Sequence, residues 1–166
     1  MHVREEAPVD IPHVHALNCA VFESPTEARI VDALRGQPDV ISLVAEDDGS
    51  IVGHIMFSPV RLTGAGEARA MGLAPMAVAP ARQRAGIGSA LVRDGLVRCR
   101  AQGVEALFVV GHPEYYPRFG FSRASGFGFT CEFDVPGEVF MALELAPGAL
   151  RGRTGQVFFN EAFRAS

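Results

Sequence analysis

Residues 71–91 read M-G-L-A-P-M-A-V-A-P-A-R-Q-R-A-G-I-G-S-A-L, and this stretch decides the fold. An apolar run ends at Pro80, a polar and basic segment follows, and the G-I-G sequence at 86–88 leads into a helical pattern. This order predicts a strand, a tight glycine turn and a helix. The first N–H groups of a helix lack internal partners and lie at the positive end of its dipole, so a glycine turn there can hold a phosphate. Arg82 and Arg84 would add positive charge beside it.

Two blocks of sequence resemble a known family. The segment from Val78 to Leu91 resembles the acyl-CoA-binding motif of the GNAT superfamily of N-acetyltransferases, written Q/R-x-x-G-x-G/A, and Gln83, Gly86 and Gly88 match its three fixed positions. A second block, Y-Y-P-R-F-G-F at 115–121, resembles the tyrosine and G-F segment that closes the same site in that superfamily. Together with the order of elements, the resemblance covers roughly residues 2–145.

The resemblance implies a mixed α/β (α+β) GNAT fold. We expect a central, twisted, mostly antiparallel sheet of six or seven strands, with one parallel pair splayed at the cofactor site and about four flanking helices. We also expect a single GNAT acetyltransferase domain at residues 1–146, followed by a C-terminal extension at 147–166 that packs on the same domain.

Hydrophobic periodicity gives the order of elements. It predicts strands at 2–6, 40–46, 51–62, 68–78, 105–111 and 138–145, and a weaker one at 157–159. It predicts helices at 9–22, from Pro25 until residues 36–39 stop it, and at 87–102, with a short helix beginning at 112–113. The sequence at 47–50 suits a hairpin turn, residues 63–67 form a loop, and 121–133 is a strand with a loop.

Composition limits the class of protein. The chain of 166 residues is 48% hydrophobic and 20% charged, as in ordered globular proteins. Its net charge of −4 argues against a general nucleic-acid binder, which needs a basic face. Three widely spaced cysteines indicate neither a disulfide framework nor a zinc site, and favour a reducing compartment. The N-terminus lacks an apolar signal core and no apolar run is long enough to span a membrane, so we expect a cytoplasmic protein with no membrane partner.

The resemblance also implies which residues bind the cofactor. Acyl-CoA would lie where the strands ending near Val78 and Gly111 splay apart, and Pro75, which lacks an N–H, suits an interruption there. The pantetheine arm would pair with the backbone of Met76, Ala77 and Val78. The pyrophosphate would lie on the turn formed by Gln83, Arg84, Ala85, Gly86, Ile87, Gly88 and Ser89. The alternative is a strand-to-helix turn with no ligand.

The implied reaction is direct attack of an amine on the thioester of acetyl-CoA in a ternary complex. It needs an oxyanion donor, a neutral amine and a proton for the departing thiolate. By resemblance, the backbone N–H of Val78 or a neighbour is the oxyanion donor and Tyr116 is the general acid. A phenol with an ordinary pKa of about 10 is reasonably matched to a thiolate. Tyr115 could exchange roles with Tyr116.

Several roles stay open at the level of sequence. The candidate general bases are Glu23, Glu27, Glu46, His54, His112 and Glu114, each of which also has an ordinary structural explanation, and a chain of water molecules could serve instead. Many family members carry an asparagine where this chain has 111–114, G-H-P-E, which weakens the assignment of the pantetheine contact and of the acid. Arg118 either binds the cofactor or pairs with an acidic neighbour.

Other residues point to no further chemistry. His13 and His15 lie on different faces of a helix, so we expect no metal site. The phenylalanines of the last third belong to the core or line the acceptor pocket, or an exposed subset forms a homodimer face: Phe127, Phe129, Phe133, Phe158, Phe159 and Phe163.

Three functions follow. The first is an N-acetyltransferase that uses acetyl-CoA as co-substrate and a small-molecule or peptide amine as acceptor. The second is a catalytically silent acyl-CoA-binding regulatory module. The third, a Rossmann-type dinucleotide-binding domain, is disfavoured because a three-strand meander precedes the glycines and the expected acidic ribose ligand is absent, apart from Glu105.

Overall fold

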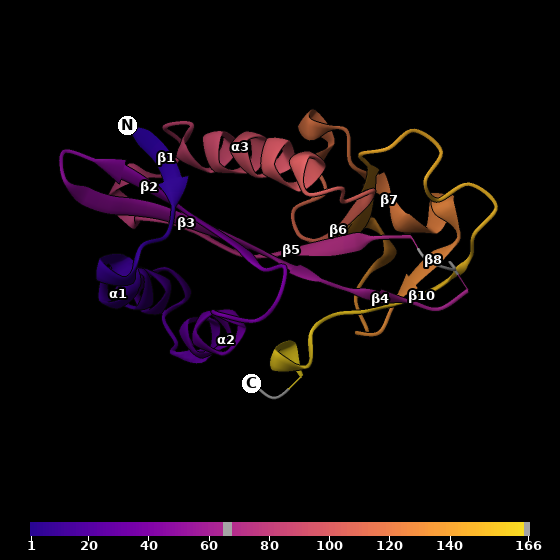
Figure 1. Cartoon of the computed structure of the whole chain (residues 1–166), viewed down its shortest axis with the longest axis horizontal. Coiled ribbons are helices and arrows are strands. Elements are labelled where there is room, and N and C mark those ends of the chain that lie inside the picture. The colour runs from indigo at the N-terminus through magenta and orange to yellow at the C-terminus, as the bar shows by residue number, and fades with distance from the viewer. Residues whose placement is uncertain (65–67, 165–166) are drawn as a thin grey trace. The chain divides into compact units, whose positions relative to one another are not determined.

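The computed structural model describes residues 1–64 and 68–164. Its main sheet has seven strands in the order β1-β2-β3-β5-β6-β9-β7, mostly antiparallel, with β5 and β6 as the parallel pair (Figure 1). The expected mixed α/β fold is therefore confirmed. The described residues form three α-helices rather than about four, because the element expected after residue 112 is a single 3-10 turn at Tyr116–Phe119.

The chain divides into two compact units. The first comprises Met1–Ser58, Ala74–Val97 and Glu161–Ser166, and the second comprises Pro59–Leu73 and Arg98–Asn160. The expectation of one domain at 1–146 with a packed extension at 147–166 stays a prediction. Residues 147–160 belong to the second unit, where they supply a strand, and 161–164 belong to the first.

The first unit is a sheet covered on both faces. Its strands are β1 (His2–Glu5), β2 (Ile41–Asp47), β3 (Ser50–Pro59, but for its last residue) and the end of β5 (Ala70–Val78). Its helices are α1 (Ile11–Phe22), α2 (Thr26–Leu34) and most of α3 (Ile87–Ala101). The helices α1 and α2 lie on one face of β2 and β3, and α3 lies on the other (Figure 1).

Apolar packing explains both layers of the first unit. Six buried side chains of α1, α2, β2 and β3 form one cluster: Val14, Ile30, Val31, Leu34, Val44 and Met56. On the other face, glycines bring helix and strand together. A Cβ at Gly95 of α3 would lie 2.3 Å from the Phe57 ring, and one at Gly53 of β3 would lie 2.9 Å from Ile87. Only a residue without a side chain permits this approach.

The second unit contains the rest of the main sheet and a second, smaller sheet. Its strands are β4 (Arg61–Leu62), the start of β5, β6 (Ala106–Val110), β7 (Ser122–Arg123), β8 (Phe129–Cys131), β9 (Phe140–Glu144) and β10 (Gly155–Phe158). The smaller sheet has the order β4-β10-β8, with β10 parallel to β8, and the sequence did not predict it. The loop expected at 63–67 falls partly on 65–67, outside the described residues.

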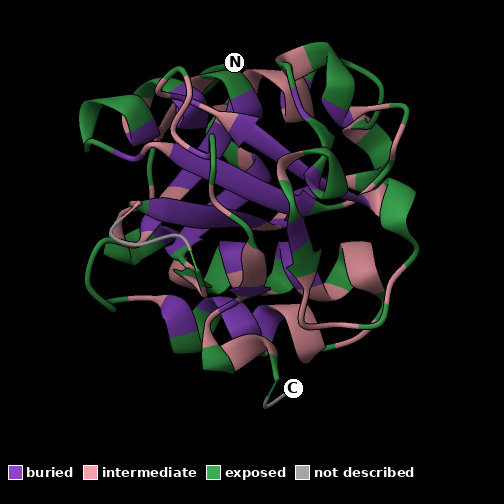
Figure 2. Cartoon of the chain, turned by 90° about the vertical axis from the view of Figure 1, so that its right-hand side faces the viewer, coloured by how far each residue is buried: buried purple, intermediate pink, exposed green. Residues whose placement is uncertain are grey.

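The parallel pair ends before its strands do. Within the described residues, the register of β5 with β6 runs from Ala70–Ala106 to Gly72–Phe108. The strand β5 continues to Val78, and β6 continues to Val110, which pairs with β9. The four residues of β6 before Val110 are all buried, and Figure 2 shows buried residues concentrated on the strands. In the part of the chain that the structure describes, no helix is both long enough and apolar enough to cross a membrane.

Candidate active site

The glycine turn predicted from the sequence joins β5 to α3 in the first unit. The N–H of Ala79 donates to the carbonyl of Val52 at 2.8 Å, and a 3-10 turn at Pro80–Arg82 follows. The N–H of Ala90 donates to the carbonyl of Gly86 at 3.0 Å. The helix therefore begins directly after Gly86. The N–H groups of the residues before Ala90 lie at the start of the helix, ahead of this first helical hydrogen bond.

The backbone at Gly86 has a conformation that lets a ligand approach it closely. Its φ is +84°, and a Cβ placed there would have no heavy atom within 4 Å. The space above this Cα is therefore open, and the glycine leaves it unfilled. Arg84, two residues earlier, is exposed and also adopts a positive φ of +65°. A bare, exposed backbone at the positive end of a 15-residue helix, beside an arginine, fits the pyrophosphate of an acyl-CoA.

Gln83 connects the turn to the end of β5. Its side-chain amide donates to the carbonyl of Val78 at 3.2 Å. Because the N–H of Ala79 is also hydrogen-bonded, the peptide between Val78 and Ala79 is held at both its oxygen and its nitrogen. Met76 and Val78 are half-buried, whereas Ala77 between them is buried. The structure thus brings the sequence-predicted residues 76–78 and 83–89 together in one unit.

Arg82 has a partner that the sequence did not reveal. Its guanidinium binds Asp47, in the β2–β3 hairpin, at 2.6 Å, and the N-terminal ammonium lies 3.4 Å from the same carboxylate. The hydrogen bond from Arg82, with that from the N-terminus, lowers the pKa of Asp47. Arg82 therefore anchors the turn to the hairpin, and Arg84 is the exposed basic residue of the turn.

Tyr116 lies in the second unit and is buried, with 6% of its surface exposed. Its ring packs at 5.1 Å from Tyr115 and 5.7 Å from Phe121, and a Cβ on Gly111 would lie 2.4 Å from its Cε2. Burial, aided by the neighbouring Tyr115, raises the pKa of Tyr116 to about 12. The expectation of an ordinary phenol was wrong, because the sequence does not show how deeply the ring is buried. The hydroxyl is fully protonated at neutral pH.

Arg118 packs on Tyr115, and its binding of the cofactor stays a prediction. Its guanidinium lies 4.4 Å from the centre of the Tyr115 ring, and its Nε donates to the Tyr115 carbonyl at 2.9 Å. This contact fixes Tyr115 beside Tyr116 and leaves Tyr115 half-buried.

The structure narrows the choice of general base. His54 is fully buried, and its Nε2 lies 2.9 Å from the Ser42 hydroxyl. Burial lowers the pKa of His54 to about 4. A side chain with no exposed surface cannot take a proton directly from an amine substrate, so His54 is a structural residue. Glu23, His112 and Glu114 are exposed and Glu27 is half-buried.

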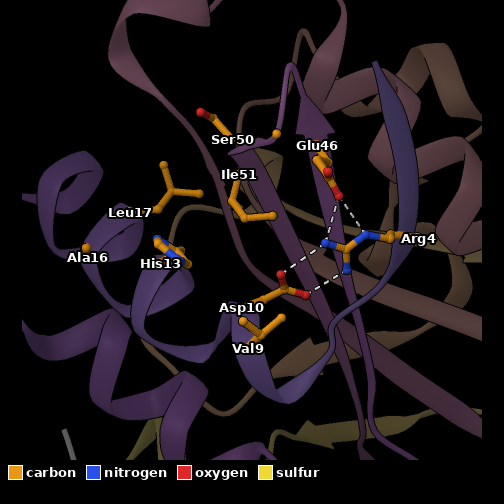
Figure 3. Close-up of a pocket in the computed structure, with 10 residues that line it drawn as sticks. Arg4, Val9, Asp10, His13, Ala16, Leu17, Glu46, Ser50 and Ile51 are labelled. Atoms are coloured by element: carbon orange, nitrogen blue, oxygen red, sulfur yellow. Dashed lines mark hydrogen bonds and ion pairs between the residues drawn. The ribbon is translucent and has the colours of Figure 1, made fainter.

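Glu46 belongs to an ion-pair network beside a pocket of about 560 Å³ (Figure 3). The guanidinium of Arg4 binds the Asp10 carboxylate at 2.7 and 3.0 Å and approaches Glu46 at 2.8 Å. The hydrogen bond from Arg4 lowers the pKa of Asp10, whose side chain is only 5% exposed. Arg4 uses its nitrogens on these carboxylates and on the Glu5 carbonyl, so the network joins β1, β2 and the start of α1. The Glu46 carboxylate is bound by Arg4, and Glu46 stays a candidate for the general base.

Sequence reasoning missed the buried partners of His54. Asn18 of α1 is fully buried, and its side-chain nitrogen donates to the Val14 carbonyl and lies 3.5 Å from His54 Nδ1. The apolar spacing of α1 did not indicate that this residue is buried, because a single asparagine in an amphipathic helix predicts a position on the surface. Within the described residues, no group of three or more histidine, cysteine or acidic side chains is placed to hold a metal ion.

The fold and this glycine turn together define a GNAT acetyltransferase, and the chain belongs to that family. Residues 2–124 match the family described as acetyltransferase (GNAT) domain. The chain is 36% identical over 165 residues to the uncharacterized N-acetyltransferase YhbS of Escherichia coli K12, covering 98% of each chain. It is 32% identical over 142 residues to the uncharacterized N-acetyltransferase YjhQ of the same organism, covering 82% of this chain and 77% of that one.

Two solved structures are similar over nearly the whole chain. One is the E. coli YhbS protein in complex with CoA, with a TM-score of 0.92 at 36% identity, covering 98% of this chain and 91% of that chain. The other is a GNAT family acetyltransferase from Brucella melitensis in complex with acetyl-CoA, with a TM-score of 0.80 at 36% identity, covering 98% and 97%.

Proposed function

We propose that this protein transfers the acetyl group of acetyl-CoA to a primary amine. The observation that carries the proposal is the open, positive-φ glycine at 86, placed where β5 enters α3. Membership of the GNAT family and the acetyl-CoA complex of a relative at 36% identity support it. A dinucleotide site of Rossmann type is excluded by the antiparallel strands β2 and β3 that precede the turn.

The residues of the glycine turn and of the end of β5 are assigned to different parts of the cofactor. The amides of Ala85 to Ser89, with Gln83 and Arg84, would bind the pyrophosphate, because this backbone is bare and lies at the positive end of α3. The backbone at Met76, Ala77 and Val78 would pair with the pantetheine arm. Gln83 acts on Val78 through its carbonyl, so we assign Gln83 a positioning role as well.

The reaction balances as follows. A substrate ammonium first loses a proton, and the neutral nitrogen attacks the thioester carbonyl, with the backbone N–H of Val78 as oxyanion donor. The C–N bond forms, the C–S bond breaks, and the nitrogen loses a second proton as the amide forms. The thiolate takes one proton, which we assign to Tyr116. One proton is released overall for each amine acetylated.

The raised pKa of Tyr116 bears on its role. A phenol with a pKa of about 12 is protonated at neutral pH, but transfer of its proton to a thiolate is unfavourable, because the ordinary pKa of a thiol is about 8.5. We therefore propose that Tyr116 gives its proton to the sulfur while the C–S bond breaks, so that no full negative charge accumulates on the departing sulfur. The base stays among Glu23, Glu27, Glu46, His112, Glu114 and water.

The acceptor class and setting are also proposals. The acceptor is a small-molecule or peptide amine, and the protein works in the cytoplasm, where acetyl-CoA is available. A homodimer is a further proposal, which sedimentation at several protein concentrations would test.

The test is a thermal titration with acetyl-CoA, CoA and NAD, because a ligand that binds only the native state raises the unfolding midpoint. Gly86→Ala should abolish the shift, since a methyl group would fill the open space above the turn. The matched control is Gly36→Ala, because Gly36 has a φ of +85° and equally open surroundings. Both variants carry the same backbone cost of about 1–2 kcal/mol. A shift with NAD but not with either CoA species, or equal shifts in both variants, contradicts the proposal.

A further inference from the structure

The hairpin of β2 and β3 contacts the cofactor turn, which is the glycine turn at residues 79–87, at three places in the first unit. At the start of the turn, the N–H of Ala79 donates to the Val52 carbonyl of β3 at 2.8 Å. At its end, the buried Ile87 packs over Gly53 of β3, where an added Cβ would lie 2.9 Å from the Ile87 side chain. Both ends of the turn are therefore attached to β3.

The third contact lies in the middle of the turn. Residues 83–86 are exposed, as are Pro80 and Ala81, whereas Arg82 is half-buried. The guanidinium of Arg82 binds the carboxylate of Asp47, the last residue of β2, at 2.6 Å. The side chain of Arg82 thus joins the exposed part of the turn to the hairpin.

The exposed part of the turn has a backbone that benefits from such support. Arg84 has a φ of +65°, a conformation that residues with a side chain rarely adopt, and Gly86 has a φ of +84°. A flexible turn would lose conformational freedom when it closed on a phosphate, and this loss would weaken binding. A turn that is already held in its bound conformation avoids the loss. The ion pair between Asp47 and Arg82 can therefore strengthen cofactor binding, although Asp47 itself carries a negative charge.

The charge of Asp47 makes this role distinguishable from simple electrostatics. CoA is a polyanion, so a carboxylate near its phosphates repels it, and removal of that carboxylate should tighten binding. Loss of the carboxylate would also release Arg82, which could then bind a phosphate directly. Both effects predict a lower Kd for CoA when Asp47 is neutralised. Support of the turn predicts a higher Kd.

We infer that Asp47 is a positioning residue for the cofactor, and that it acts through Arg82 to hold residues 83–86 in the conformation that binds the pyrophosphate. In this role the guanidinium of Arg82 stays on the hairpin, and the phosphates lie on the backbone of the turn. The inference rests on the proposed function and adds the β2–β3 hairpin to the cofactor site.

The first test is the Kd for CoA, measured by isothermal titration calorimetry with the whole chain. We expect Asp47→Asn to raise this Kd about fivefold. The unfolding midpoint of the ligand-free variant should fall by no more than about 4 °C, because both side chains of the ion pair are partly exposed. A loss of affinity in a folded variant then reports on the turn and not on the stability of the chain.

The matched control is Asp48→Asn. Asp48 is the next residue of the hairpin and is exposed, and asparagine tolerates its φ of +49°. This variant loses the same charge as Asp47→Asn but keeps the ion pair with Arg82. It should lower the Kd for CoA or leave it within about twofold.

A double variant separates Arg82 from the other partner of Asp47, because the N-terminal ammonium lies 3.4 Å from the same carboxylate. In an Arg82→Gln background, Asp47→Asn should change the Kd for CoA by less than about twofold. An equal fivefold loss in both backgrounds overturns the inference, because Asp47 would then act without Arg82.

A further measurement needs no ligand. The N–H of Arg82 donates to the Ala79 carbonyl at 2.8 Å, so its hydrogen exchange reports whether the turn is held. Exchange at this amide should quicken about fivefold in Asp47→Asn and stay unchanged in Asp48→Asn. Equal exchange rates in the two variants overturn the inference.

The outcomes for CoA also separate this inference from the proposed function. Binding of CoA by the wild-type chain, with a lower or unchanged Kd in Asp47→Asn, overturns the positioning role and leaves the acetyltransferase standing. Absence of CoA binding by the folded wild-type chain contradicts the proposed function and overturns the inference with it.

Discussion

His54 lies in the buried interior of the first unit. Its imidazole is fully buried between Ser42 and Asn18. Burial is the main cause that lowers the pKa of His54, Glu6 offsets part of this effect, and Arg35 adds to it. The ring is therefore neutral in the folded state at neutral pH. An unfolded chain would bind a proton near the ordinary histidine pKa of about 6.5.

This difference predicts a loss of stability in mild acid. Between pH 6.5 and about 4 the unfolded state binds more protons at His54 than the folded state does, so the free energy of unfolding falls as the pH falls. The full contribution, present above pH 6.5, is about 3 kcal/mol. Urea unfolding at pH 7, 6, 5 and 4.5 would measure it, with His54→Gln removing this part of the slope.

Substitution of Tyr116 distinguishes an enzyme from a catalytically silent acyl-CoA-binding module. Phe at this position keeps the ring contacts with Tyr115 and Phe121 and removes only the hydroxyl. We expect Tyr116→Phe to lower kcat about 10²- to 10⁴-fold, as for loss of a general acid, with the acetyl-CoA thermal shift unchanged. Tyr115→Phe is the neighbouring control and should reduce kcat far less. If the two variants show interchanged effects, Tyr115 is the acid.

Among the elements, α3 and β3 meet through a glycine contact that sets their separation. A Cβ at Gly95 would lie 2.3 and 2.4 Å from two atoms of the Phe57 ring, closer than real contacts allow. Helix propensity alone makes Gly→Ala stabilising by about 1 kcal/mol. The overlap should reverse that sign, so that Gly95→Ala lowers the free energy of unfolding by about 1–3 kcal/mol.

The double variant Gly95→Ala with Phe57→Leu provides the check. Leucine removes the ring atoms that overlap, so the two changes together should cost less than the sum of each alone. Strict additivity in chemical denaturation would show that Phe57 is not the obstacle.

Local sequence predicted the elements that depend on local pattern. The uninterrupted apolar run of β6, the amphipathic α3 and the hairpin between β2 and β3 all lie close to where periodicity put them. The short helix expected after residue 112 shrank to one 3-10 turn, because Pro117 and the left-handed Gly120 leave no room to extend it.

Elements and contacts that depend on the register between strands could not be predicted from the sequence. The smaller sheet joins strands two to four residues long, too short to carry a period. The pairs Arg82–Asp47 and Arg4–Glu46 join residues 35 and 42 positions apart, and they exist only because strands align in a particular way. The cofactor turn could be predicted from the sequence, because all of its residues are consecutive and it does not depend on how strands align.

At the scale of the whole molecule, each unit is assembled from distant parts of the chain. The last described turn, Glu161–Phe163, returns to the first unit, where Ala162 and Phe163 pack against the buried cluster of α1 and α2. A half-buried phenylalanine at that position covers side chains that the first 56 residues alone would leave open. The end of the chain therefore contributes to a core that its beginning mostly builds.

We expect Phe163→Ala to lower the free energy of unfolding by about 1–3 kcal/mol, less than the roughly 3–5 kcal/mol of a fully buried phenylalanine, because the side chain is only half-buried. The loss should be local as well as global: hydrogen exchange should quicken in the amides of α2, which contacts this turn, before it quickens in β8 and β10. Phe158→Ala supplies the contrast, since Phe158 belongs to β10 in the other unit and should quicken exchange there instead. Unchanged protection of α2 in Phe163→Ala would mean that the C-terminal turn rests on the cluster without stabilising it.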